Sequence, residues 1–235
     1  MAWALLAAAL VALTLRLGFW QLSRAEQKIQ WQHNIETQAS LSALTLAQLR
    51  DKPQAWQQTH RRVVLQGEWL NDKTVYLDNR AHLGRMGFWV MTPLRVQRGQ
   101  VVWVQRGWVE RDANDPRQMP ALPLPLDAEP IEGRIAPPLS HMVELGEGPA
   151  LSAQNLPQIR ANLDLPQMQS LVQDNVMAVV VQTGAEGGGL RRDWPQVAAS
   201  AGKNQAYAFQ WFALSALLAF LYLWFQWIKA YRHGR

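Results

Sequence analysis

The sequence contains no cysteine, and this absence excludes several classes of site. A disulfide framework, a thiol nucleophile and a cysteine-based metal site are all ruled out. The motifs of serine hydrolases (G-x-S-x-G), zinc proteases (H-E-x-x-H) and P-loop proteins are missing as well. The five histidines show no i, i+3 or i+4 spacing, so each is expected to be a polar surface group. These absences make a catalytic role, such as an enzyme acting on envelope substrates, the weakest interpretation of the sequence.

The excess of positive charge is small. Lys and Arg number 23 against 18 Asp and Glu, which gives a formal net charge of +5. The basic residues are scattered along the chain instead of forming one stripe. A nucleic-acid partner is therefore not expected.

What the sequence does have is a long apolar run near each end. Residues 207–228 (YAFQWFALSALLAFLYLWFQWI) contain no charge, no glycine and no proline. As a helix this run measures roughly 33 Å, enough to cross a bilayer core of about 30 Å. Tryptophans lie towards both of its ends, as in an aromatic belt, and residues 229–235 form a short basic tail. The alternative is a buried helix of a soluble domain, which usually carries a polar stripe.

A second apolar run opens the chain, and we expect a transmembrane helix over residues 2–22. A cleaved signal peptide is the alternative. Against it, no basic region precedes the run and no small-residue cleavage site follows it. From residue 23 to about residue 39 the pattern continues as a polar helical stalk, which begins an extramembrane domain over residues 23–203.

The middle of this domain is rich in predicted strands. Alternation in residues 61–70 and the return in 73–79 predict two strands, and residues 88–96 and 101–109 predict another pair. Residues 101–104 (VVWV) are apolar on both faces, which indicates a central strand, whereas Pro93 indicates an edge position or a bulge. Further strands are predicted over residues 130–135 and 176–182. We expect an antiparallel meander.

The remaining segments are expected to be loops and short helices. Residues 115–130 carry five prolines, which favours an extended, solvated excursion. Asp164 with Gln167 predicts the N-terminus of a small helix. Residues 184–189 (GAEGGG) lack the ending of a phosphate-binding loop and indicate a flexible loop. The expected fold class is a membrane-anchored α+β protein, in which two terminal transmembrane helices flank an antiparallel β-rich domain.

Two tripeptides are the candidate contact residues of this domain. Asp78, Asn79 and Arg80 are expected to end one strand, and Arg106, Gly107 and Trp108 to end another. Two interpretations stay open. The tripeptides form either a contact for a partner or ligand, or a structural pairing of Asp with Arg.

Several stretches, in this order, resemble the Surfeit locus protein 1 family, the cytochrome c oxidase assembly factors of mitochondria and bacteria. They are residues 17–24 (LGFWQLSR) with Lys28, residues 78–80 (DNR), 87–94 (GFWVMTPL), 104–109 (VQRGWV) and 207–212 (YAFQWF). The resemblance covers almost the whole chain. It implies a bacterial inner-membrane protein with both termini in the cytoplasm and its main domain in the periplasm.

The resemblance also implies a function. Such a protein is expected to act as a membrane chaperone without catalysis, assisting haem a delivery or insertion into subunit I of cytochrome c oxidase. Its expected partners are subunit I, the proteins of haem a synthesis and assembly, and the lipid bilayer. The alternative is a carrier that binds haem a itself.

The same resemblance identifies the residues that haem a would meet. Bacterial members are associated with haem a through a histidine three residues before the Tyr-Ala-x-x-Trp-Phe motif, where this chain has Asn204, followed by Tyr207 and Trp211. An amide is a poor ligand for haem iron beside imidazole. Either another group such as His60 or His82 serves, or this chain acts on the oxidase without holding haem.

Overall fold

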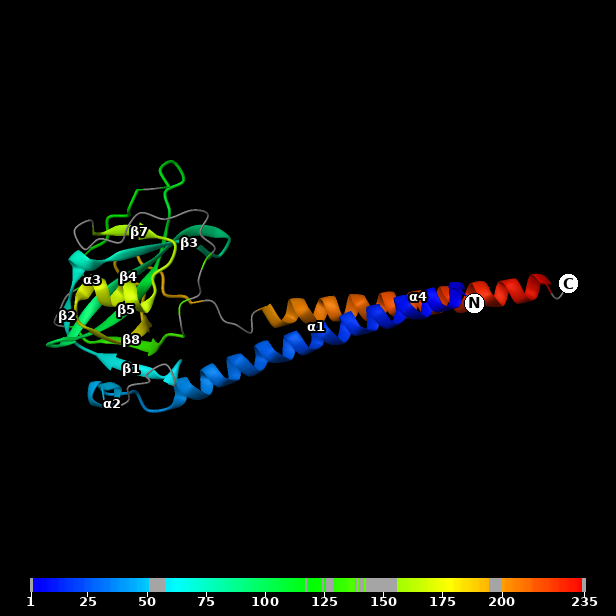
Figure 1. Cartoon of the computed structure of the whole chain (residues 1–235), viewed down its shortest axis with the longest axis horizontal. Coiled ribbons are helices and arrows are strands. Elements are labelled where there is room, and N and C mark those ends of the chain that lie inside the picture. The colour runs from blue at the N-terminus through cyan, green and yellow to red at the C-terminus, as the bar shows by residue number, and fades with distance from the viewer. Residues whose placement is uncertain are drawn as a thin grey trace. The chain divides into compact units, whose positions relative to one another are not determined.

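The computed structural model describes residues 2–50, 58–116, 118–123, 125, 129–137, 139, 142, 156–194 and 200–233. The chain divides into two compact units. Met1–Asn34 together with Pro195–Arg235 form the helical unit, and Ile35–Trp194 form the sheet unit. Figure 1 labels the helices and strands of both. His141 and the last two residues of the expected tail lie outside the described residues.

The two long helices carry the apolar runs found in the sequence. They are α1 (Ala2–Ser40) and α4 (Ala201–His233). Each is long and apolar enough to cross a membrane, and only 11% of its most apolar window is buried. A core helix of a soluble protein would be mostly buried, so the low value favours lipid around both helices. The polar stalk continues α1 without a break, as predicted.

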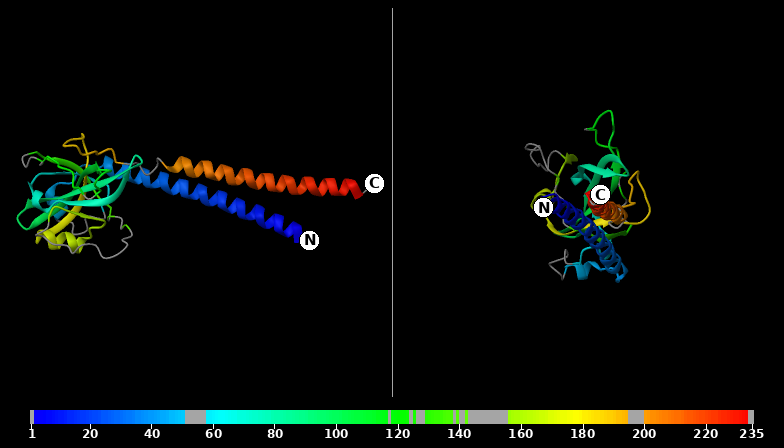
Figure 2. Two further views of the ribbon diagram at one scale, coloured as in Figure 1. Left: turned by 90° about the horizontal axis from the view of Figure 1, so that it is seen from above. Right: turned by 90° about the vertical axis from the view of Figure 1, so that its right-hand side faces the viewer.

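Small side chains line the contact between α1 and α4, which run alongside each other in opposite directions (Figure 2). On α4 the buried positions Ala201, Ala208 and Ser215 recur every seven residues, and on α1 Gly18 is packed against the ring of Phe212. Helices in lipid associate where small residues let the two backbones approach closely. Gly18 supplies such a position, because a Cβ there would collide with that ring.

Eight strands among the described residues make one mixed sheet. They are β1 (Arg62–Leu65), β2 (Glu68–Trp69), β3 (Val75–His82), β4 (Arg85–Gln97), β5 (Gln100–Glu110), β6 (Ile131–Ile135), β7 (Gln158–Arg160) and β8 (Asn175–Gln182). Their order is β1-β6-β8-β5-β4-β3-β7, with β2 pairing β4. The predicted antiparallel meander is present as β3–β4–β5. The sheet as a whole is not antiparallel, because β5–β8 and β3–β7 are parallel pairs.

The core lies on both faces of β5. Val102 and Val104 pack in one cluster with β1, β2 and β6, while Val101 and Trp103 pack in another beneath α3 (Leu165–Val172). All four are fully buried. The prediction of a central strand at residues 101–104 is therefore confirmed.

The sheet unit also contains short helices. The predicted capping box of α3 is confirmed, because the Asp164 carboxylate accepts from the Gln167 backbone N–H while the Gln167 side chain accepts from the Asp164 N–H. α2 (Leu46–Arg50) is the extra turn after the stalk, and η2 (Asn71–Lys73) forms the turn before β3.

One strand prediction is wrong, and a second is only partly right. Residues 61–70 do not form one strand, because the chain breaks between β1 and β2 at Gly67, where a Cβ would collide with the Arg95 carbonyl. For Pro93, the edge position is wrong, since β4 has β5 on one side and β3 on the other. The alternative of a bulge fits better, because the β4–β5 register shifts nearby, between Arg95 and Gln97. Pro93 is tolerated inside the sheet because β4 stops pairing with β3 at Met91 and starts pairing with β2 at Leu94. Pro93 lies in the gap between these two pairings, so its nitrogen, which has no hydrogen, is not required to donate a hydrogen bond.

The proline-rich segment contains no helix or strand among its described residues, and most of them are exposed, as predicted; a few contacts nevertheless tie it to the sheet. The Tyr76 hydroxyl donates to the Pro120 carbonyl (3.1 Å), and Arg106 Nη2 donates to the Pro123 carbonyl (3.3 Å). Leu122 packs against the cluster of Tyr76, Phe88, Val90 and Leu190. These contacts fasten a mainly exposed segment to the sheet.

Candidate functional site

The tripeptide Asp78, Asn79 and Arg80 lies inside β3 and not at its end. Here β3 supplies Asp78 and Asn79 where β4 supplies only Phe88, which makes a β-bulge. Asn79 takes a positive φ of 61°, and its N–H donates to Asp78 Oδ1 (2.6 Å). The predicted Asp–Arg pairing exists, but the partner of Asp78 is Arg111 (3.4 Å).

The second tripeptide lies at a second bulge, inside β5. Gln105 pairs with Met91 and Gly107 with Val90, so Arg106 is the extra residue. Bulges often redirect a side chain next to a functional site. The two bulges flank the same stretch of β4, residues 87–91, from opposite sides. The structure therefore brings the two predicted tripeptides together across one strand.

Trp108 is the residue that joins them. Its indole lies over Gly87 of β4, and its Nε1–H donates to the Arg80 carbonyl of β3 (2.7 Å). A Cβ on Gly87 would lie 2.6 Å from the indole ring. Gly87 thus leaves the room that allows β5 to reach β3 across β4.

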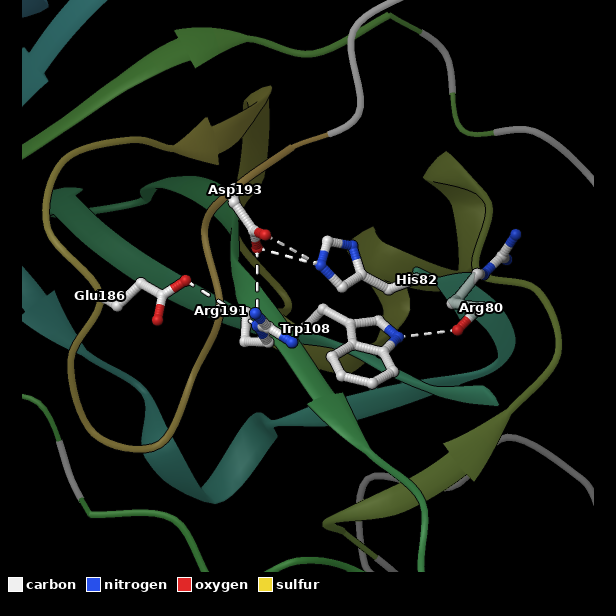
Figure 3. A network of polar contacts seen from close by, with 6 residues as sticks. All are labelled: Arg80, His82, Trp108, Glu186, Arg191 and Asp193. Carbon is white, nitrogen blue, oxygen red and sulfur yellow. Dashed lines mark hydrogen bonds and ion pairs between the residues drawn. The ribbon is translucent and has the colours of Figure 1, made fainter. Parts of the chain in front are cut away.

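A polar network surrounds this indole, as Figure 3 shows. His82, two residues after Arg80 on β3, lies beside Trp108 with ring centroids 5.0 Å apart and ring planes tilted by 38°. Its Nε2 lies 3.0 Å from Asp193 Oδ1, and Arg191 Nε lies 3.7 Å from the same oxygen. Arg191 also exchanges two backbone hydrogen bonds with Trp108, each 2.8 Å. The network therefore fastens residues 190–193, which precede α4 in the chain, to the two bulged strands.

Two arginines of the tripeptides are buried with their charge. Arg80 lies over the Trp89 ring (4.6 Å) and donates to the Ala161 carbonyl (2.9 Å). Burial lowers the pKa of Arg80, and Asp78 partly offsets this effect. Arg106 lies 5.6 Å from the centroid of Trp69, and burial lowers its pKa to about 10, so it remains charged at neutral pH.

In the helical unit, Asn204 is bonded to α1 at both ends of its amide. Lys28 Nζ donates to Asn204 Oδ1 (2.7 Å), and Asn204 Nδ2 donates to Gln21 Oε1 (2.6 Å). Tyr207 is exposed, whereas Trp211 is half-buried seven residues after Asn204. These contacts do not fit Asn204 as an axial ligand of haem iron, because both amide groups already serve the helix pair.

The prediction that every histidine is a surface group is wrong for His82, whose side chain is 6% exposed. The available signal was strand alternation, since His82 falls on the same face of β3 as Arg80. Asp193 and Gln21 gave no local signal, because their partners are distant in sequence. Within the described ranges, no group of three or more His, Asp or Glu side chains could hold a metal ion.

Comparison with known proteins identifies the family to which this chain belongs. The family model described as the SURF1 family matches residues 8–216. A SURF1-like protein of Rickettsia bellii is 23% identical over 224 residues, which cover 88% of this chain and 83% of that protein. One from Rickettsia felis is 31% identical over 94 residues, only 39% of either chain. The yeast cytochrome oxidase assembly protein SHY1 is 30% identical over 114 residues, which cover 46% of this chain and 29% of that protein. Since the family model spans most of its length, the chain belongs to the SURF1 family.

Proposed function

We propose that this protein is an assembly factor for cytochrome oxidase that acts as a membrane chaperone without catalysis. The observation that carries the proposal is the family match over residues 8–216, supported by the likeness to a yeast protein named for cytochrome oxidase assembly. In this role the protein would assist haem a delivery or insertion into subunit I. Its partners would be that subunit and the proteins that make and deliver haem a.

The two apolar helices support a membrane location for the proposed role. We place the protein in a bacterial inner membrane, with both termini in the cytoplasm and the sheet unit in the periplasm. Two spans put both ends on one side of the membrane, and the short basic tail after α4 favours the cytoplasm for them.

The buried network supports a binding role over a catalytic one. Trp108, Arg80 and His82 make contacts within the protein, and Arg106 binds the proline-rich segment. These contacts are of the kind that hold a rigid surface in shape for a partner. The alternative role of haem a carrier needs a ligand other than Asn204, whose amide is bonded to Gln21 and Lys28.

Deletion of the gene tests the assembly role. Cytochrome oxidase activity and its haem a content should fall, while other respiratory enzymes stay normal and a plasmid copy restores both. Unchanged oxidase activity in the deletion strain would refute the proposal.

An absorption spectrum separates the chaperone from the carrier. The protein, purified from cells that make haem a, should be colourless if it acts as a chaperone. A haem spectrum in the unaltered protein would favour the carrier. The matched variant is Asn204→His, which supplies the missing imidazole and shows whether the position accepts haem at all.

A further inference from the structure

The turn between β3 and β4 contains a leucine where the backbone favours other residues. His82 pairs with Arg85, so the loop consists of only Leu83 and Gly84. Both have positive φ values, 46° and 81°. Two-residue hairpin turns of this type favour Asn-Gly or Asp-Gly, because a leucine side chain is strained at positive φ. The turn geometry therefore does not explain Leu83.

The leucine is also unusually exposed. Leu83 is 74% exposed, the highest value among the large apolar residues that the structure describes in the sheet unit. A Cβ on Gly84 would meet no atom within 4 Å, so the turn projects into open space. Ala81 and Met86 form an exposed cross-strand pair directly behind it. We call Ala81, Leu83 and Met86 the hairpin tip.

The polar neighbour of the tip is already paired. Arg85 Nη1 lies 2.8 Å from Glu110 Oε2 on β5. The exposed side chains of the tip itself, Ala81, Leu83 and Met86, are apolar. A strained, exposed leucine is a reason to look for a contact that covers it.

We propose that the hairpin tip docks into the interfacial layer of the lipid bilayer. The hairpin is tied through His82 to Asp193, and only residues 194–200 separate Asp193 from α4, one of the two helices that can span a membrane. This short connection favours lipid over a soluble partner as the occupant. The inference rests on membrane anchoring and is independent of the role in oxidase assembly.

The absence of cysteine makes a site-specific test direct, since one introduced thiol is the only one in the chain. Leu83→Cys carries the environment-sensitive dye NBD, and the full chain is reconstituted in phosphatidylcholine/phosphatidylglycerol vesicles. The expected result is blue-shifted emission that spin-labelled lipids quench severalfold. Met86→Cys repeats the measurement from the other side of the turn. Val64→Cys is the matched control, because Val64 is an apolar strand residue of the same unit that is 43% exposed.

Two outcomes would overturn the proposal. One is emission from positions 83 and 86 that is as water-like as that from position 64. The other is a blue shift that lipid spin labels do not quench and that fades as the protein is diluted in lipid, which would identify a second copy as the occupant. Circular dichroism confirms that each labelled variant is folded.

Discussion

Trp108→Phe tests whether the indole joins the two bulged strands. The substitution keeps an aromatic ring next to His82 but removes the Nε1–H that donates to the Arg80 carbonyl (2.7 Å). Both residues are nearly fully buried, so water cannot readily replace the donor. A buried group that loses its hydrogen-bond partner costs about 1–3 kcal/mol.

The chain provides a matched control in Trp103→Phe. Trp103 is also buried, but its Nε1 has no hydrogen-bond partner among the described residues. Both substitutions trim an indole to a phenyl ring and leave similar space. The control therefore carries the packing loss without the hydrogen-bond loss, and the difference between the two variants isolates the bond to Arg80.

Urea unfolding of the full chain in detergent, followed by far-UV circular dichroism, measures this difference. With a slope of about 2 kcal/mol/M, Trp108→Phe should unfold at a urea concentration roughly 0.5–1.5 M below that of Trp103→Phe. Equal midpoints, or a lower midpoint for Trp103→Phe, would show that the indole bond does not stabilise the sheet unit.

Three further perturbations follow from the contacts. Gly87→Ala should destabilise the sheet unit by about 1–3 kcal/mol in the same assay, because the new Cβ would collide with the Val109 carbonyl oxygen and meet the Trp108 ring at 2.6 Å. Gly187→Ala, with no atom within 4 Å of the new Cβ, should be neutral. Asn204→Leu should weaken the α1–α4 pair by about 1–2 kcal/mol in detergent unfolding, since it removes two hydrogen bonds; an unchanged midpoint would contradict this. Burial, and to a lesser extent the charge of Arg134, lowers the pKa of His60 below its usual 6.5. The stability that neutral His60 contributes is therefore present above pH 6.5 and is lost as the pH falls through the lowered pKa. His60→Asn, which tolerates the positive φ of 72°, should flatten this acid-side loss, and parallel pH profiles of the two proteins would refute it.

Local patterns predicted the elements whose signals are local. The apolar runs, the doubly apolar VVWV of β5 and the Asp164–Gln167 capping box each depend on neighbouring residues and were confirmed. The pairing of strands depends on distant residues. Nothing in residues 62–65 indicates that β1 pairs β6, and nothing in β8 indicates that it runs parallel to β5.

The candidate site shows the same division. The tripeptides at residues 78–80 and 106–108 were found in the sequence, but the bulges that bring them together were not. A bulge is one extra residue on one strand of a pair, so it depends on how two strands pair and cannot be read from the sequence of either strand alone. His82 and Asp193 are 111 positions apart, so their contact exists only in the folded chain.

The position of β8 has a consequence for how the protein is made. Residues 175–182 insert between β6 and β5, two strands that are complete long before β8 leaves the ribosome. Until β8 is made, the edges of both strands carry unpaired backbone N–H and C=O groups, with which strands of other chains can pair. β8, which joins the two parts of the sheet, is synthesised shortly before α4. A product truncated before residue 175 therefore keeps these unpaired strand edges and is expected to aggregate instead of forming a smaller working protein.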